Sequence, residues 1–267
     1  MFRYKRNIHA SWCPEHAGPI KDTYAIEKNP QYRLEVQSKE AGQVWVLLSR
    51  HITDKKDFAN NQKFITLHVK KSDGKRVYYP GEYLHEGIKI NAPHYLAKIS
   101  FSKGISYYTL IVSQLEALSK IHYTIRVYSS AEVSLGPVLN PYKNTRSLTD
   151  EWTKDTGGGC VNNPTFIHNP VYRLEIEGAG PLGAADVLFK VEGPRKFSVG
   201  FQLTPEVKTP SLPQMNSGPY RPGLAVLETS LPPGNYSIIP STFNPGEVAP
   251  FFLTVSCSHG FKLNRVK

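Results

Sequence analysis

The chain has little of what membrane-spanning, exported or disulfide-stabilised proteins need. None of its 267 residues belongs to a run near the roughly 18 apolar residues that a membrane helix requires. The basic segment from Met1 to His9 is not followed by the apolar stretch of a secretory signal. Cys13, Cys160 and Cys257 are odd in number and widely spaced, which favours a reduced compartment over a disulfide framework. We therefore expect an intracellular, cytoplasmic protein.

Helical periodicity is also scarce, and short runs of β-branched and aromatic residues take its place. Gly, Pro, Asn and Asp separate these runs about every 8 to 12 residues, as in antiparallel β-sandwiches. Ser72-Asp73-Gly74 is predicted to be the tip of a hairpin, 114–121 is compatible with a short helix, and the proline-rich segment 205–222 is predicted to be a surface loop. The expected strands include Tyr32–Val36, Phe64–Val69, Tyr107–Val112, Tyr123–Tyr128, Tyr172–Ile176, Lys196–Leu203 and Phe251–Val255.

The strand pattern occurs twice. Trp12 is followed by Asn-Pro-Gln-Tyr-Arg-Leu at 29–34, and Trp152 is followed at the same interval by Asn-Pro-Val-Tyr-Arg-Leu at 169–174. Towards the end of each copy the similarity resumes at a different offset, where Tyr123 corresponds to Phe251. A repeat of this length is a whole domain. The predicted fold class is therefore all-β, with two tandem antiparallel β-sandwiches.

The two copies are not equivalent in charge. The boundary is predicted at the Gly- and Pro-containing step near residue 138, which gives domains 1–138 and 139–267. Residues 1–140 contain 20 Lys and Arg against 12 Asp and Glu, a net charge of +8. Because the whole chain has a net charge of +10, the remaining residues contribute only +2. The first copy is thus expected to have the more strongly charged surface.

The second copy contains a long and specific motif, which consists of Trp152, Gly157-Gly158-Gly159-Cys160, Pro164-Thr165-Phe166 and Asn169–Leu174. The first copy contributes Ile8–Trp12 and Trp45–Asp54. The motif of the second copy is similar to the start of the C2-like, calpain-type β-sandwich that follows the protease core of calpains. With the segments of the first copy, nearly the whole chain resembles the tandem pair of such domains at the C-terminus of PalB-type calpains, the branch without EF-hands.

The resemblance implies a non-catalytic region of a calpain-like cysteine endopeptidase. It implies that the region supports or regulates the protease core and binds substrates or partners, with endosomal sorting proteins as partners and endosomal membranes as a second location. The sequence patterns that surround the catalytic Cys, His and Asn of the family are absent from this chain, so we expect no activity from it alone. An alternative is a peptidase site that pairs Cys13 or Cys160 with a histidine.

A basic cluster is the strongest functional signal apart from the resemblance. Its members are Lys55, Lys56, Lys63, Lys70, Lys71, Lys75 and Arg76. A basic hairpin of this kind could bind anionic phospholipid, with about 1 kcal/mol per lysine near a charged membrane. The alternative function is therefore an independent peripheral membrane module, and the simplest alternative is a solvated surface. Nucleic acid is not expected, because Tyr78 and Tyr79 are predicted to pack within a strand rather than stack on bases.

No cofactor is predicted. Calcium needs six to eight oxygen ligands, and the two candidate groups, Asp54 with Asp57 and Asp150 with Glu151 and Asp155, supply few. Calcium therefore remains an alternative without assigned metal ligands. The three glycines at 157–159 are predicted to form a tight turn, with an anion-binding nest of amides as the alternative.

Overall fold

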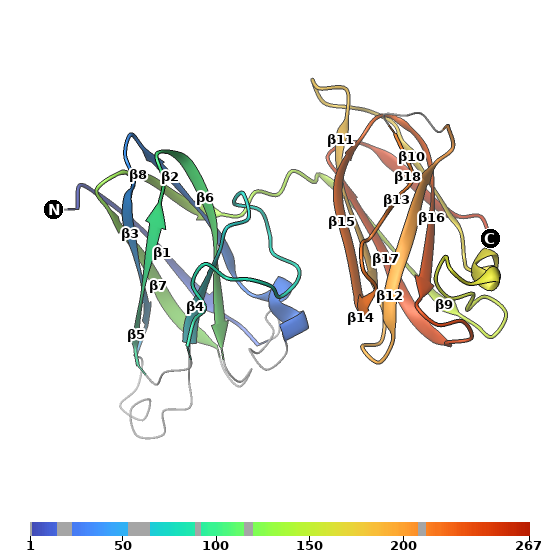
Figure 1. The fold of residues 1–267 in the computed structure, drawn as a ribbon, viewed down its shortest axis with the longest axis horizontal. Helices are drawn as coiled ribbons and strands as arrows, with labels where there is room; N and C mark the ends of the chain where they lie inside the picture. The colour runs from blue at the N-terminus through green and yellow to red at the C-terminus, as the bar shows by residue number, and fades with distance from the viewer. Residues whose placement is uncertain (1, 15–22, 53–64, 89–91, 115–119, 208–211) are drawn as a thin grey trace. The chain divides into compact units, whose positions relative to one another are not determined.

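The computed structural model describes residues 2–14, 23–52, 65–88, 92–114, 120–207 and 212–267. The chain divides into two compact units, Met1–Leu139 and Asn140–Lys267 (Figure 1). This division lies one residue from the predicted boundary. Among the described residues, no helix has the length and apolar character needed to cross a membrane.

The first unit is a sandwich of two antiparallel sheets. One sheet has the strand order β1-β7-β3-β5, and the other has the order β4-β6-β2-β8 (Figure 1). Its strands are β1 (Tyr4–Trp12), β2 (Gln31–Ser38), β3 (Gly42–Arg50), β4 (Ile65–Lys70), β5 (His94–Phe101), β6 (Gly104–Gln114), β7 (Ile121–Ser129) and β8 (Glu132–Pro137).

Alternation along the strands creates the core of the first unit. In β5 every second residue is buried, from Tyr95 to Phe101, and the residues between them are exposed. The inner faces of both sheets contribute to one apolar cluster, which includes Leu34 and Leu110 from one sheet and Val46 from the other. Full burial of each such aliphatic side chain contributes about 1.5–3 kcal/mol.

The second unit is built in the same way. Its two antiparallel sheets have the orders β15-β11-β17-β9 and β13-β12-β16-β10-β18, with β14 pairing to β12. Its strands are β9 (Asn144–Trp152), β10 (Tyr172–Ile176), β11 (Ala185–Glu192), β12 (Ser198–Pro205), β13 (Met215–Asn216), β14 (Arg221–Pro222), β15 (Leu224–Leu231), β16 (Gly234–Thr242), β17 (Ala249–Cys257) and β18 (Phe261–Arg265).

The repeat seen in the sequence has a direct structural counterpart. The order β1-β7-β3-β5 of the first unit corresponds to β9-β17-β11-β15 of the second. Trp12 and Trp152 end the first strand of their units, and both side chains are completely buried. The all-β fold predicted from the sequence is confirmed.

Two local predictions need correction, and a third falls mostly outside the described residues. After the turn at 72–75 no second hairpin strand forms; segment 75–84 is irregular, and only His85 makes an isolated bridge, to Val69 of β4. The segment 205–222 is not wholly loop, because β13 and β14 extend the sheet at β12. The predicted helix 114–121 begins in β6 and ends in β7, and its residues 115–119 lie outside the described residues.

Two short 3-10 helices were not anticipated. They are η1 (Thr23–Lys28) and η2 (Pro164–His168), each just before an Asn-Pro pair. Helices of one to two turns have too few residues to establish a periodicity in the sequence. They fix the approach of the chain to β2 and β10.

Candidate interaction surfaces

The structure places only part of the predicted basic cluster. Lys55, Lys56 and Lys63 lie outside the described residues. Lys70, at the end of β4, is half-buried. Arg76 is also half-buried, and its Nη1 donates a hydrogen bond of 2.5 Å to the carbonyl oxygen of Glu27. Arg76 therefore has a structural contact within the first unit.

The turn at residues 72–75 presents two lysines. Asp73 and Gly74 have φ values of 53° and 70°, and the Lys75 amide donates to the Ser72 carbonyl over 2.9 Å, as in a type I′ turn. A Cβ on Gly74 would lie 2.7 Å from Cγ of Arg33, so this position requires glycine. Lys71 and Lys75 are the exposed cations beside the turn.

The glycine loop of the second unit surrounds Asn169. This completely buried side chain accepts a hydrogen bond from the Gly158 amide at 3.1 Å and donates to the carbonyl oxygens of Gly159 and Phe166, both at 2.9 Å. The Cys160 amide donates to the carbonyl of Phe243. Because these amides have protein acceptors, the loop is a tight structural turn around Asn169.

The equivalent asparagine of the first unit has other partners. Asn29 accepts a hydrogen bond from Nε1 of Trp12 at 3.1 Å and donates to Oγ of Ser113 at 3.3 Å. In the second unit the indole of Trp152 donates instead to the carbonyl of Pro240. The repeat thus preserves the buried Trp and Asn but changes how they are satisfied.

The acidic group around Trp152 is tied into the fold through Asp150. Its carboxylate accepts hydrogen bonds from the hydroxyl of Tyr172 and, at 2.9 Å, from Nη1 of Arg265. Burial and the hydrogen bond to Asp150 raise the pKa of Tyr172. Glu151 and Asp155 are exposed. Among the described residues, no group of three or more His, Cys, Asp and Glu side chains is arranged to hold a metal ion.

The three cysteines are free thiols in different surroundings. Cys160 is buried, and its Sγ accepts a hydrogen bond from Nδ2 of Asn163 at 3.3 Å. Cys13 is half-buried, with its Sγ 3.7 Å from Oγ of Ser11. Burial raises the pKa of Cys257, which disfavours its thiolate. The contacts of these thiols are those of structural residues.

The outer face of the β1-β7-β3-β5 sheet has a distinctive composition, and we name it the basic-aromatic face. It contains three permanent cations, and no Asp or Glu stands at the outward positions of these four strands. The strand registers and burial patterns define these positions as Lys5, Asn7, His9, Ser11, Gln43, Trp45, Leu47, Ser49, His94, Leu96, Lys98, Ser100, His122, Thr124, Arg126 and Tyr128.

One row of this face crosses all four strands. Lys5 of β1 is opposite Tyr128 of β7, Tyr128 is opposite Trp45 of β3, and Trp45 is opposite Lys98 of β5. Nζ of Lys5 lies 5.6 Å from the centre of the Tyr128 ring, and Nζ of Lys98 lies 5.3 Å from that of Trp45. Both distances suit cation–π attraction. The row is therefore an aromatic pair between two ammonium groups.

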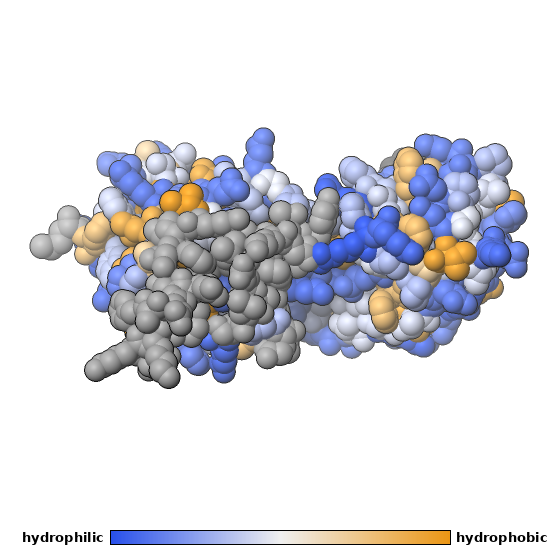
Figure 2. Space-filling model, turned by 90° about the horizontal axis from the view of Figure 1, so that it is seen from below, coloured by the Kyte–Doolittle hydropathy of each residue, from blue (hydrophilic) through white to orange (hydrophobic). Residues whose placement is uncertain are grey.

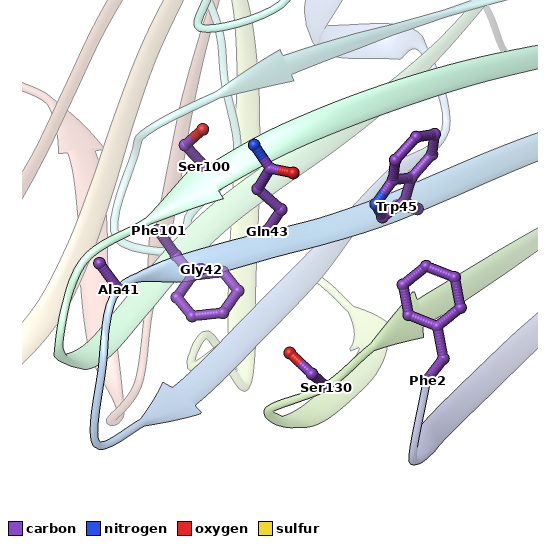
Figure 3. Close-up of a pocket in the computed structure, with 8 residues that line it drawn as sticks. All are labelled: Phe2, Ala41, Gly42, Gln43, Trp45, Ser100, Phe101 and Ser130. Carbon is purple, nitrogen blue, oxygen red and sulfur yellow. The ribbon is translucent and has the colours of Figure 1, made fainter.

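Phe2 adds a third ring to this aromatic group. Its ring centre is 6.3 Å from Trp45 and 5.9 Å from Tyr128. A depression of about 650 Å³ lies at the first residues of β3. Phe2, Gln43 and Trp45 are among the residues that line it (Figure 3). The ring of Phe101 fits against Gly42, where a Cβ would lie 2.7 Å from Cζ of Phe101. The rings leave an accessible, partly apolar surface.

Histidines occupy the other end of the basic-aromatic face. Nδ1 of His9 and Nε2 of His51 lie 2.9 Å and 2.6 Å from the hydroxyl of Thr124. Partial desolvation and the charges of His9, His122 and Arg126 lower the pKa of His51. Protonation of His51 in acid adds positive charge next to a face whose outward positions contain no Asp or Glu to balance it.

The corresponding sheet of the second unit has the opposite charge. Its outward positions include four carboxylates and one lysine, a net charge of −3, whereas the basic-aromatic face has three permanent cations, a net charge of +3. We name this second surface the acidic face. Its charged residues are Glu151, Asp186, Lys190, Glu192 and Glu228.

The rest of the visible surface gives no comparable signal. On the side shown in Figure 2 the second unit is largely hydrophilic, with hydrophobic residues among polar ones. Scattered exposed apolar residues are normal in folded proteins. Sequence reasoning missed the basic-aromatic face because its residues come from four strands, and no stretch of sequence contains the row.

Comparisons with known proteins agree with the fold. Residues 201–256 match the profile of the family described as calpain large subunit, domain III. Calpain-7 of Sus scrofa is 47% identical over 258 residues, which cover 92% of this chain and 31% of that protein. Calpain-7 of Homo sapiens is 43% identical over 280 residues, which cover 100% of this chain and 34% of that protein. The calpain-like protease palB/RIM13 of Aspergillus oryzae is 28% identical over 277 residues, which cover 96% of this chain and 31% of that protein.

The sandwich fold and the profile match define the class of this region, which is a calpain-type β-sandwich region. The similarity across nearly the whole chain places it more closely. The chain belongs to the PalB-type branch of the calpain family and corresponds to the C-terminal region of such proteins. It spans about a third of the length of the curated relatives that it matches.

Proposed function

We propose that this chain is the regulatory and scaffolding region of a calpain-type cysteine endopeptidase. The single observation that carries the proposal is the similarity to Calpain-7, which covers 92% of this chain but only 31% of the relative. The chain supplies two rigid sandwiches, each with its own core. Rigid domains of this kind can fix the arrangement of a protease core and offer surfaces to substrates and partners.

The proposal covers both units. Only residues 201–256, in the second unit, match the domain III profile. The first unit is proposed to be a diverged copy of the same domain because it has the same strand order and the same buried Trp at the end of its first strand. We propose a cytoplasmic location, with partners that include the protease core itself and endosomal sorting proteins.

The test is reconstitution with a protease core. The core of human Calpain-7 is expressed alone, fused to this chain, and fused to an unrelated tandem β-sandwich of similar size. We expect the authentic fusion to hydrolyse a casein-type substrate faster and to melt at a higher temperature than the other two. Equal activity and equal stability in all three would contradict the proposal.

The membrane alternative rests on less of the predicted cluster. Lys71 and Lys75 are exposed beside the turn, whereas Arg76 has an internal hydrogen bond. Two exposed lysines contribute on the order of 2 kcal/mol near an anionic surface. Sedimentation with phosphatidylserine vesicles, with and without calcium, separates this alternative from the first, because salt-sensitive binding that is lost in Lys71→Glu/Lys75→Glu would favour it.

A further inference from the structure

We propose that the basic-aromatic face of the first unit binds an extended acidic segment of a partner protein, in which two carboxylates flank an apolar side chain. The inference needs only the surface of the first unit and does not depend on the role proposed for the chain beside a protease core. Its evidence is the row formed by Lys5, Tyr128, Trp45 and Lys98.

Charge determines the sign of the partner. Lys5, Lys98 and Arg126 stand on three different strands of the face, and no carboxylate lies at the outward positions to neutralise them. A field of one sign attracts a partner of opposite sign and speeds its association. The acidic face of the second unit shows that the same sheet can tolerate carboxylates at these positions. Their absence in the first unit is therefore a property of this surface rather than of the fold.

The aromatic pair determines what lies between the charges. Trp45 and Tyr128 are half-buried neighbours on the outer face, and Leu96, on the next strand, is 50% exposed. Aromatic side chains with accessible ring surface supply much of the binding energy in protein interfaces. A partner with carboxylates alone would leave these rings in water, so an apolar group is expected in the middle of the segment.

Strand geometry determines the spacing. The backbones of Lys5 and Lys98 are on the two edge strands of the sheet, three strand spacings or about 14 Å apart. Because both ammonium groups lean over the rings between these strands, about 14 Å is the upper limit of the distance that the two carboxylates must span. An extended chain covers about 14 Å in four residues. Because alternate side chains of an extended segment point to the same side, carboxylates at positions i and i+4 face the two lysines and an apolar residue at i+2 faces the rings.

A flat sheet face of this kind fits a peptide better than a bilayer. The lysines lie over the rings at 5.6 Å and 5.3 Å, so the cations and the apolar surface share one level of the sheet. A bilayer is best met by basic residues around a protruding apolar tip that reaches the acyl region. Membrane binding through this face is therefore treated as an outcome that the test must distinguish.

The test uses the full chain and a fluorescein-labelled peptide that contains Glu-Ser-Leu-Ser-Glu. Two control peptides replace both Glu with Gln, or the Leu with Ser. We expect fluorescence anisotropy to show saturable binding of the first peptide and at least about tenfold weaker binding of each control, which corresponds to about 1.4 kcal/mol. No binding of the first peptide at chain concentrations up to about 1 mM would overturn the proposal.

The location is tested by two variants with the same change in charge. Lys5→Glu/Lys98→Glu reverses the row, and Lys71→Glu/Lys75→Glu reverses the turn of the same unit. We expect the first to weaken peptide binding at least about tenfold and the second less than about twofold. Equal weakening would show general attraction to a basic unit and would overturn the proposal. The proposal would also be overturned if the chain bound phosphatidylserine vesicles through Lys5 and Lys98 but did not bind the peptide.

The unmodified chain provides a measurement that requires no variant. Trp12 and Trp152 are completely buried, whereas Trp45 is partly accessible, so the three indole signals in an NMR spectrum report different sites. We expect titration with the acidic peptide to shift the Trp45 signal and leave the other two in place. Saturable binding with an unchanged Trp45 signal would overturn the proposed location.

Discussion

At the scale of single residues, the two copies use one asparagine position in two ways. Asn29 binds the indole of Trp12, whereas Asn169 holds the glycine loop through three hydrogen bonds to the backbone. The position was identified from the sequence, because an Asn precedes Pro in both copies. Its partners could not be predicted, because they come from segments that only the fold brings together.

Asn169→Ala is expected to destabilise the second unit by about 2–4 kcal/mol. The change leaves the Gly158 amide and two carbonyl oxygens without their buried partner, and each such loss costs about 1–3 kcal/mol, partly offset by relaxation. Urea unfolding of the second unit measures the effect. Asn244→Ala is the matched control, since Asn244 is exposed, its side chain donates to Glu247 at the surface, and its backbone bond from Thr242 survives the change. A loss below about 1 kcal/mol in Asn169→Ala would contradict this account.

Histidines make the first unit sensitive to acid. Burial lowers the pKa of His68; the charge of Glu86 opposes this decrease, and the charge of His85 adds to it. Burial also lowers the pKa of His85, and partial desolvation lowers the pKa of His51. The unfolded chain therefore binds protons more readily than the folded unit. Stability is fully present above about pH 6.5 and is lost as the pH falls below that value.

We expect thermal melts of the first unit to show a falling Tm from pH 7 to pH 5. His68→Asn tests the main contributor. Nδ1 of His68 accepts a hydrogen bond from the Gly87 amide at 3.1 Å. Oδ1 of Asn can accept the same hydrogen bond, but the Asn side chain does not titrate. This variant should have a smaller decrease in Tm over the same range. An unchanged slope would show that His68 is not a source of the acid sensitivity.

At the scale of strands, the two copies share a tyrosine whose hydroxyl has a hydrogen-bond partner on a different element in each unit. In the first unit the hydroxyls of Tyr32 on β2 and Tyr123 on β7 lie 2.6 Å apart and join the two sheets. In the second unit the position of Tyr123 is taken by Phe251, and Tyr172 on β10 donates instead to Asp150 on β9. Each unit thus has its own polar link between sheets.

A double-mutant cycle tests this exchange of partners. Asp150→Ala removes the acceptor of Tyr172 and is expected to destabilise the second unit by about 1–3 kcal/mol. Phe251→Tyr should restore about 1 kcal/mol when Asp150 is already Ala, because it supplies the hydroxyl that Tyr123 supplies in the first unit. In the unmodified chain the same change should give no gain. Additive effects in chemical denaturation would argue against a shared link.

The elements that the sequence predicted well are those in which burial alternates. Tyr172–Ile176 was predicted with the bounds that β10 has, because its side chains alternate between the core and the surface. The strand predicted after Ser72-Asp73-Gly74 does not form. The segment contains residues suited to a strand, and the outer side of the edge strand β4 is open to it. The segment leaves β4 because both backbone groups of Val77 are bonded by the side chain of Gln31, and only His85 returns to bridge Val69.

At the scale of the whole molecule, the chain consists of two independent cores. Each apolar cluster draws its buried residues from one unit only. The repeat in the sequence predicts two domains, and the charge count places the excess of positive charge in the first copy. It could not reveal the basic-aromatic face, because the pairing of Trp45 with Tyr128 and Lys98 is a matter of strand register.

Fragments 1–139 and 140–267 are therefore expected to fold separately. Each should give a β-type circular dichroism spectrum, a cooperative melt and a buried tryptophan, since each retains both of its sheets. Amide NMR spectra of the two fragments should superimpose on most of the spectrum of the intact chain. An unfolded fragment would show that its core depends on the other unit.

The different links at Tyr32 and Tyr172 have a consequence for folding. Similar neighbouring domains in one chain are prone to exchange strands and become trapped in misassembled forms. If β9 took the place of β1, Asp150 would enter a unit in which Tyr32 already has Tyr123 as its partner, and a buried carboxylate would lack Arg265. If β1 took the place of β9, Ala10 would leave the hydroxyl of Tyr172 without an acceptor. Divergence at these positions thus disfavours the exchange of strands between the two units, because each exchanged strand would lack its polar partner.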